Sequence, residues 1–298
     1  MKLLISGGTG FLGASLCQWL AQRGHTLLVL TRQRLPVFPV TGVQYCSWDD
    51  PAWRQAMAEI EGVINLAGEP MAGGRWSAAR KARLRASRLE TTHRLVDAIA
   101  ASGHKPAVLV NASAIGYYGP RGDELLSERD ASGRGFLAEL CQAWEAQAQQ
   151  AESLGVRVVR LRIGLVLGRD GGVLAKMVPP FRAFLGGPLG SGRQWLSWIH
   201  REDVHSLIEW VLTHPTLLGA VNATAPNPAT MREFCAALGR FLGRPSWLPA
   251  PAPALRLLLG EMAEMLVTGQ RVVPSAARAN GFSFRYPDLA LALQACVA

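Results

Sequence analysis

The chain has 298 residues, of which 49% are hydrophobic and 18% charged, and its formal net charge is +9. This is enough apolar material for one large α/β domain with a smaller appendage, and it argues against a disordered or fibrous protein. No stretch approaches the ~20 consecutive apolar residues of a membrane span, and the chain enters a strand-like segment without a signal-peptide pattern, so we expect a cytoplasmic protein.

The five cysteines are scattered without a C-x-x-C pair, so the sequence predicts neither a disulfide framework nor a metal site. A charge of +9 suits nucleic acid or an anionic small molecule such as a triply phosphorylated dinucleotide. The basic residues are spread along the chain apart from a cluster between Arg75 and Arg94, and no nucleic-acid-binding motif accompanies them. We therefore expect a small-molecule partner and no nucleic acid.

Short apolar or β-branched segments alternate with helix-period segments from the first residues onward. This alternation predicts a Rossmann-type, doubly wound parallel sheet covered by helices on both faces. We expect the dinucleotide-binding domain at residues 1–170, completed by about 195–225, and substrate-side loops and a small C-terminal module at 171–194 and 226–298. The expected strands are Lys2–Ser6, Thr26–Thr31, Val43–Ser47, Val63–Leu66, Val108–Ala112 and Arg157–Leu161.

A glycine-rich turn follows the first strand. Glycines 7, 10 and 13 lie in Gly7–Gly13, and a helix-like stretch, Ala14–Arg23, ends before Gly24. Glycine is required where backbone contacts a pyrophosphate and where a helix packs closely on a strand, and the free N–H groups of the helix start favour phosphate. The strand-turn-helix context favours dinucleotide binding over an ordinary turn.

The end of the second strand distinguishes NAD from NADP. An NAD site places a carboxylate there for the adenosine 2'-hydroxyl, but this chain has Thr31 and Arg32, and no Asp or Glu from His25 through Trp48. Arg32 and Arg34 offer charge-assisted hydrogen bonds to a 2'-phosphate. The sequence therefore predicts NADP(H), the alternative being that Arg32 is a solvated surface charge.

Asn65–Gly68 closes the fourth strand with small residues that would let the backbone line the cofactor. In the next helical segment, Arg88 falls on the apolar stripe that contains Leu84 and Leu95, so it faces the sheet. A buried arginine needs an anion. Arg88 is thus a candidate phosphate or substrate contact, the alternative being an internal ion pair.

Together these residues resemble the extended and atypical short-chain dehydrogenase/reductases, and more narrowly the epimerase-family (SDR39U1-like) proteins that carry a C-terminal domain of unknown function. The resemblance covers essentially the whole chain. Its motifs are Gly7–Gly13, Val63–Pro70, Arg75-Trp76, Ser87–Thr92, Gly116–Gly119, Pro180-Phe181, Gly186–Gly192, Trp198–His200, Gly269–Arg271 and Gly281-Phe282.

The resemblance implies a small lobe over the nicotinamide, a homodimer and two sets of site residues. Residues Ile163–Val166 would lie against the nicotinamide, and Ser113, at the end of the fifth strand, would correspond to the superfamily's catalytic serine. The cofactor residues would be Gly7, Thr9, Gly10, Phe11, Leu12, Gly13, Thr31, Arg32, Leu66, Ala67, Arg88 and Val166.

The superfamily's Tyr-x-x-x-Lys pair should lie around Gly135–Glu139, but no Tyr-x-x-x-Lys exists in this chain. A phenol without the lysine keeps a pKa near 10 and is a poor base, yet it remains a usable acid. Tyr117 is therefore the candidate proton donor, with Ser113 orienting the substrate. This favours reduction over sugar epimerisation, which begins with a base. The alternative is that Tyr117 and Tyr118 are packing residues.

Further candidates for an anionic or flat substrate are Lys176, Arg193, Trp198 and His200, although Trp198 and His200 also suit packing roles. Asp203 is expected to cap a helix at Val204–Leu212. Two functions remain open: an NADP(H)-dependent reductase of a small carbonyl-type substrate, and a catalytically weak or inactive NADP(H)-binding regulator. A basic nucleic-acid-associated protein is a weaker third.

Overall fold

A computed structural model describes residues 1–32 and 40–297. Its centre is a seven-stranded sheet in the order β11-β7-β5-β4-β1-β2-β3, in which every neighbouring pair is parallel. All six predicted strands are present within two residues of their expected bounds, and the Rossmann-type α/β class is confirmed. The strands are β1 (Lys2–Ser6), β2 (Thr26–Thr31), β3 (Val43–Ser47), β4 (Gly62–Asn65), β5 (Val108–Ala114), β7 (Arg157–Ile163) and β11 (Gly219–Ala223).

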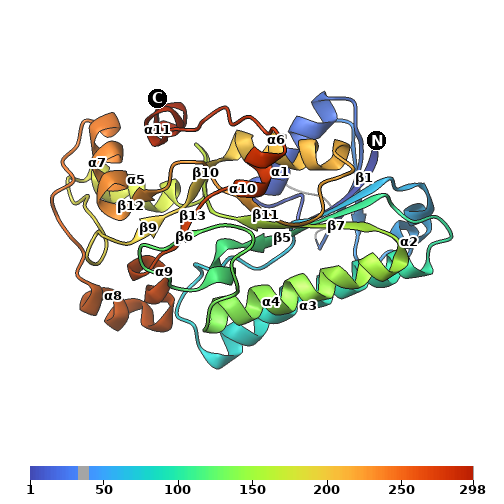
Figure 1. The fold of residues 1–298 in the computed structure, drawn as a ribbon, viewed down its shortest axis with the longest axis horizontal. Coiled ribbons are helices and arrows are strands. Elements are labelled where there is room, and N and C mark those ends of the chain that lie inside the picture. Colours follow the sequence, from blue (N-terminus) through green and yellow to red (C-terminus); the bar gives the residue numbers. More distant parts are fainter. Residues whose placement is uncertain (33–39, 298) are drawn as a thin grey trace.

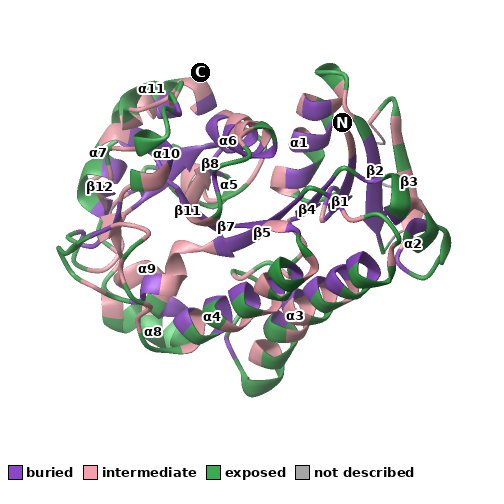
Figure 2. Cartoon of the chain, turned by 45° about the vertical axis from the view of Figure 1, so that its right-hand side comes forward, coloured by how far each residue is buried: buried purple, intermediate pink, exposed green. Residues whose placement is uncertain are grey.

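Helices cover both faces of this sheet (Figure 1). On one face lie α2 (Ala52–Ala56), α3 (Ala78–Ala101) and α4 (Phe136–Gln149); on the other lie α1 (Phe11–Gln22), α6 (Arg201–Thr213) and α10 (Ser275–Ala279). Alternate residues of β1 supply the two cores, since Leu3 and Ile5 join one apolar cluster and Leu4 joins the other. Burial on both faces explains the nearly continuous apolar strands that Figure 2 shows as buried.

A smaller lobe lies beyond the carboxyl ends of the sheet. Its core includes Phe181, Trp198 and Phe234. Its elements are β8 (Leu165–Leu167), α5 (Leu174–Arg182), β9 (Trp195–Leu196), β10 (Trp198–His200), β12 (Ala229–Thr230), α7 (Met231–Leu242), α8 (Ala252–Leu259), α9 (Glu264–Val267) and α11 (Leu289–Val297). Short 3-10 helices are η1 (Met57–Glu59), η2 (Ile115–Tyr118), η3 (Gln150–Leu154) and η4 (Gly260–Ala263).

The C-terminal segment crosses back to the large domain before it ends. β13 (Arg271–Val272) pairs with β6 (Leu125–Leu126), and Ala277 and Phe282 are buried in the core of the sheet. The lobe and the sheet are thus joined by more than one crossing of the chain. Among the described residues, no helix has the length and apolar character needed to cross a bilayer.

The predicted N-cap at Asp203 is wrong. Helix α6 begins at Arg201, and the His200 ring accepts the N–H of Glu202 at 3.3 Å. Asp203 is buried inside the helix and accepts the backbone N–H groups of Arg285 and Tyr286 at 2.8 and 3.0 Å. Its partners come from more than 80 residues further along the chain, so local sequence could not reveal them.

Candidate active site

The turn after β1 is built so that only glycine fits. Gly7 has a φ of +76°, and a Cβ on it would lie 2.6 Å from the carbonyl carbon of Leu66. A Cβ on Gly13 would lie 2.2 Å from the Gly7 carbonyl oxygen. Helix α1 starts at Phe11, three residues earlier than predicted, and Gly10 caps it without a side-chain hydrogen bond. The first amides of α1 are therefore left for a ligand.

Most of the residues that the sequence predicts for the cofactor lie around this turn and at the ends of β2 and β4. Thr31 is buried at the end of β2 and Arg32 is exposed directly after it; Arg34 lies outside the described residues. Leu66 and Ala67 are half-buried and their backbone lies against Gly7. Thr9 is exposed and Leu12 half-buried at the start of α1. These positions agree with a dinucleotide lying across the carboxyl ends of β1, β2 and β4, where the strand order reverses.

A cavity of about 590 Å³ reaches this region through Leu66, which lines it and whose backbone lies against Gly7. Its floor comes from the ends of β4, β5 and β7, one wall from α3 and α4, and the opposite wall from residues Glu261–Gln270 of the smaller lobe. The lining is mainly apolar and includes Leu66, Met71, Trp76, Ser113, Phe136, Leu137, Leu140, Cys141, Trp144, Ile163, Leu165 and Met265. Concave apolar cavities with few polar groups are the usual form of small-molecule sites.

Arg88 reaches this cavity from α3. As the helical spacing predicted, it is buried. Its guanidinium donates to the carbonyl oxygens of Leu84 and Glu69, both at 3.1 Å, lies 5.2 Å from the Trp144 ring, and crosses Gly68, where a Cβ would be 3.0 Å from its Cζ. Within the described residues it forms no ion pair with a carboxylate, which leaves the charge available to a bound anion.

Ser113 also lines the cavity, and its hydroxyl forms a hydrogen bond with a buried carboxylate. It donates to Glu145 Oε1 at 2.7 Å, and both residues are buried. Arg162 binds the same carboxylate through two hydrogen bonds of 2.9 and 3.0 Å. Burial alone would lower the pKa of Arg162, but the hydrogen bonds and the charge of Glu145 outweigh this effect and raise the pKa, so the guanidinium remains charged. Because its proton points to Glu145, Ser113 offers lone pairs to a ligand.

Helix α4 presents Leu137 and Cys141 to the cavity, four residues apart and beside Ser113. This is the spacing of Tyr-x-x-x-Lys, two residues further along than the interval predicted for it. Glu139, inside that interval, is exposed and does not line the cavity. Burial raises the pKa of the Cys141 thiol to about 11. Among the described cavity-lining residues there is no tyrosine, lysine or histidine.

Tyr117, the predicted proton donor, does not line the cavity. The guanidinium of Arg162 lies 3.4 Å from its ring centroid, and the ring packs edge-on against Tyr118 at 5.4 Å. Tyr118 is buried and donates to Asn222 at 2.7 Å, and burial raises its pKa to about 12. Both rings therefore pack beneath the site, which is the alternative that the sequence left open.

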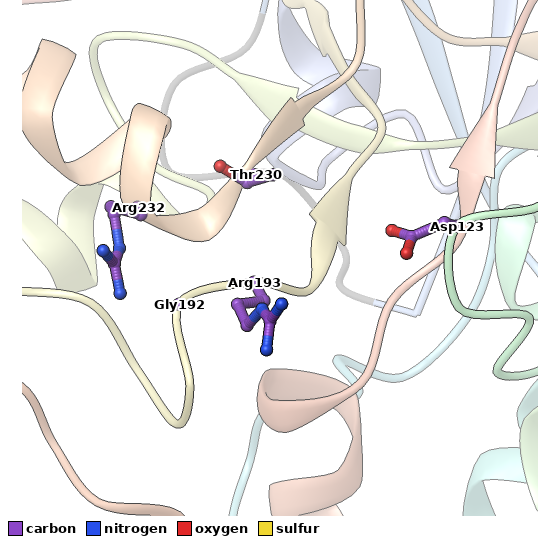
Figure 3. Close-up of a pocket in the computed structure, with 5 residues that line it drawn as sticks. All are labelled: Asp123, Gly192, Arg193, Thr230 and Arg232. Carbon is purple, nitrogen blue, oxygen red and sulfur yellow. The ribbon is translucent and has the colours of Figure 1, made fainter.

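The other substrate candidates also lie outside the cavity lining. Lys176 donates to the carbonyl of Ala72 at 2.7 Å, and Trp198 is a core residue. His200 is buried, and burial lowers its pKa to about 4. Arg193 faces a separate open pocket with Arg232 and Asp123, shown in Figure 3. Val166 is half-buried in β8, one residue beyond the cavity-lining Ile163–Leu165.

Sequence reasoning missed Glu145, Arg162, Cys141 and Arg134. A buried Glu145 has one local signal, its place on the apolar face of α4, but its partner Arg162 lies on β7, so only the fold brings them together. Leu137 and Cys141 have the spacing of the missing Tyr-x-x-x-Lys pair, two residues after the predicted interval. A search for that spacing in the neighbouring positions would have found them.

Comparison with known proteins agrees with this geometry. A family model described as the NAD dependent epimerase/dehydratase family matches residues 3–223, and one described as a domain of unknown function, DUF1731, matches residues 250–296. The chain is 43% identical to the Arabidopsis thaliana protein named epimerase family protein SDR39U1 homolog, chloroplastic, over 99% of this chain and 86% of the relative. It is 38% identical to the mouse epimerase family protein SDR39U1, with both chains fully covered. A crystal structure of human SDR39U1 (isoform2) with NADPH has 34% identity and a TM-score of 0.90, covering 100% of this chain and 99% of that one.

Proposed function

Since the chain belongs to the NAD-dependent epimerase/dehydratase family, as an SDR39U1-like protein with a C-terminal DUF1731 domain, we propose that it is an NADP(H)-dependent oxidoreductase. Its reaction is the reduction of a small carbonyl-type substrate in the apolar cavity. The observation that carries the proposal is the position of that cavity. It lies at the carboxyl ends of β4, β5 and β7, it includes Leu66, whose backbone lies against Gly7, and the smaller lobe lines it from the other side.

The residues at the turn fit NADP(H). The close approach of Gly13 to the Gly7 carbonyl and the free amides of α1 suit a diphosphate, which would lie on this helix start. Arg32 suits the 2'-phosphate and Arg88 an anionic or polar group of the same cofactor. The human relative was crystallised with NADPH, which supports the same choice here. NADPH, when bound, supplies a hydride to an acceptor carbon.

The proton for the new hydroxyl group has to come from the cavity lining. The Ser113 hydroxyl already donates its proton to Glu145, so we assign the proton to the Cys141 thiol. A thiol with a pKa of about 11 is protonated at neutral pH and is an adequate acid toward an alkoxide oxygen. The substrate oxygen takes this proton, the S–H bond breaks, and the resulting thiolate, close to Arg88, regains a proton from water.

The same lining disfavours epimerisation. Abstracting a proton from a sugar hydroxyl at neutral pH needs a base, and a thiol with a raised pKa is scarcely ionised there. Leu137 and Cys141 lie on the face of α4 that meets Ser113, so at this place the described lining offers an acid and no efficient base. The two carboxylates of the lining, Glu261 and Glu264, come from the smaller lobe and pair with cations. Reduction is the direction that such a site supports.

A second function, an NADP(H)-binding regulator, is favoured by one observation: Leu137 gives the cavity a group that cannot exchange a proton at that point of α4. The two functions are separated by incubating the full-length protein with NADPH deuterated at C4 and a panel of apolar aldehydes and ketones. A reductase transfers deuterium to the carbonyl carbon of the substrate, so the alcohol product carries the label on that carbon. Tight NADPH binding without labelled product from any compound would refute the reductase and leave the regulator.

A further inference from the structure

We propose that the outer part of the cavity recognises a substrate with an apolar, ring-containing body and one anionic group, a carboxylate, sulfonate or phosphate, which Arg134 binds. The proposal rests on the proposed function, because it names the class of molecule that would be reduced. It moves the anion-binding role from Lys176 and Arg193, which lie outside the cavity lining, to a residue of the lining itself.

The charges around the cavity do not cancel. Among the residues that the structure describes, four charged ones line it: Arg88, Arg134, Glu261 and Glu264. Glu261 forms an ion pair with Lys81, and Glu264 accepts from Arg256 at 2.8 Å, so both carboxylates are neutralised by cations outside the lining. No hydrogen bond or ion pair of the Arg134 side chain occurs within residues 1–32 and 40–297. The cavity therefore keeps two uncompensated positive charges, and an anionic ligand would offset them.

The backbone holds Arg134 in place. Gly133 donates its N–H to the carbonyl of Tyr117 at 2.9 Å, and a Cβ on Gly133 would lie 2.1 Å from the Tyr118 carbonyl oxygen. Gly135, with a φ of +94°, then forms the N-cap of α4. The loop that carries Arg134 is thus packed directly on η2, and binding an anion there would require ordering of the side chain alone.

The two arginines lie at different parts of the site. Arg88 is buried beside Gly68, after β4 and toward the dinucleotide turn, whereas Arg134 is exposed and precedes α4. One cation thus serves the cofactor side and the other the incoming molecule. The two parallel N–H groups of a guanidinium pair with two neighbouring oxygens of an anion, and carboxylate, sulfonate and phosphate all present such a pair, so they form one class here.

The side chains of the cavity walls indicate what the rest of the ligand is like. Trp76 and Phe136 meet edge-to-face with ring centroids 5.3 Å apart, and Met71 packs with them in one apolar cluster. Met265 belongs to the same cluster and comes from the smaller lobe. Aromatic rings and flexible thioethers contact flat apolar molecules well and adapt to different ring systems. A long polar substrate would leave these walls without partners.

Two dyes that differ by one sulfonate test this assignment in the NADP⁺-loaded, full-length protein. The anionic probe is 1-anilinonaphthalene-8-sulfonate, and the neutral probe is N-phenyl-1-naphthylamine. In Arg134→Gln, affinity for the sulfonate should fall roughly tenfold while affinity for the neutral dye stays the same. Arg129→Gln, an exposed arginine outside the cavity lining, is the matched control and should change neither. Leu137→Trp, which fills the cavity, should weaken both dyes.

Three results would overturn the assignment: equal effects of Arg134→Gln on both dyes, no effect on the sulfonate, or an unchanged affinity of both dyes in Leu137→Trp with its melting temperature retained. The sulfonate effect should also shrink in 1 M salt, since Arg134 is exposed to solvent. The readout does not require turnover. A failure of NADPH to be oxidised would thus count against the reductase and not against Arg134.

Discussion

The Ser113 hydroxyl and the Glu145 carboxylate meet at 2.7 Å under the floor of the cavity, where both are buried. Glu145→Gln would leave Arg162 buried without an opposite charge in bidentate contact, so we expect the free energy of unfolding to fall by about 3–5 kcal/mol. Urea denaturation measures this. Glu264→Gln, which breaks the exposed pair with Arg256, should cost less than about 1 kcal/mol, and similar losses in the two variants would contradict the burial of Glu145.

The glycine turn makes a prediction about Gly13. Since a Cβ there would lie 2.2 Å from the Gly7 carbonyl oxygen, Gly13→Ala must displace the start of α1 from β1. NADPH affinity, followed by quenching of tryptophan fluorescence, should fall more than about tenfold, since the amides that face the diphosphate move. Gly103→Ala is the matched control, because a Cβ there meets no atom within 4 Å. Normal NADPH binding by Gly13→Ala would refute the placement of the diphosphate.

Local sequence predicted the features whose causes are local. The run Lys2–Ser6 and the glycines after it indicate a buried strand, a tight turn and a helix start without reference to anything distant, and the structure has all three. The same alternation predicted that the strands would run parallel with helices on both faces, because a crossover between parallel strands needs a helix-length connection.

The predictions that the structure contradicts concern residues whose partners come from distant segments of the chain. The sequence around Asp203 predicts a helix cap, but its partners are the amides of Arg285 and Tyr286. Tyr117 follows β5 closely enough to suggest a catalytic role, yet the guanidinium of Arg162 on β7 lies over its ring. The outer cavity wall, with Met265, comes from the segment that the sequence predicts only as a substrate-side module, without naming the residues that face the cavity.

Arg32 should discriminate between the two reduced dinucleotides. It is exposed directly after β2, where a 2'-phosphate would lie, so Arg32→Ala should weaken NADPH binding by roughly 10- to 100-fold and leave NADH binding nearly unchanged. Isothermal titration calorimetry with both cofactors measures this, and Arg129→Ala serves as a control for a general change in charge. Equal losses for NADPH and NADH would show that Arg32 is not at the 2'-phosphate.

Cys141 should affect the reaction and not the cofactor. Removing the proposed acid in Cys141→Ala should lower the rate of deuteride transfer to the best substrate about 100-fold, while the Kd for NADPH stays within about twofold. Cys46→Ala, at a half-buried thiol in β3, should change neither. A single-turnover experiment separates the two quantities. A full rate in Cys141→Ala would show that the proton comes from elsewhere.

Two buried histidines give folding stability a defined pH dependence. Burial lowers the pKa of His200 and of His205 to about 4, against about 6.5 in an unfolded chain. Between these values the unfolded state takes up protons that the folded state does not, so stability is complete above pH 6.5, falls as the pH drops toward 4, and is not lowered further by these groups below that.

His205→Gln separates the contribution of His205 from that of His200. Its glutamine can still bond to Ser15, which lies 3.0 Å from His205 Nε2, but it does not titrate. The quantity to measure is the difference in free energy of unfolding between the wild type and the variant, by urea denaturation between pH 7 and pH 4.5. This difference should shift against the wild type by up to about 1.4 kcal/mol for each pH unit below 6.5. His104→Gln, at an exposed histidine, should run parallel to the wild type. Parallel curves for His205→Gln would mean that His205 binds its proton as readily in the folded state as in the unfolded one.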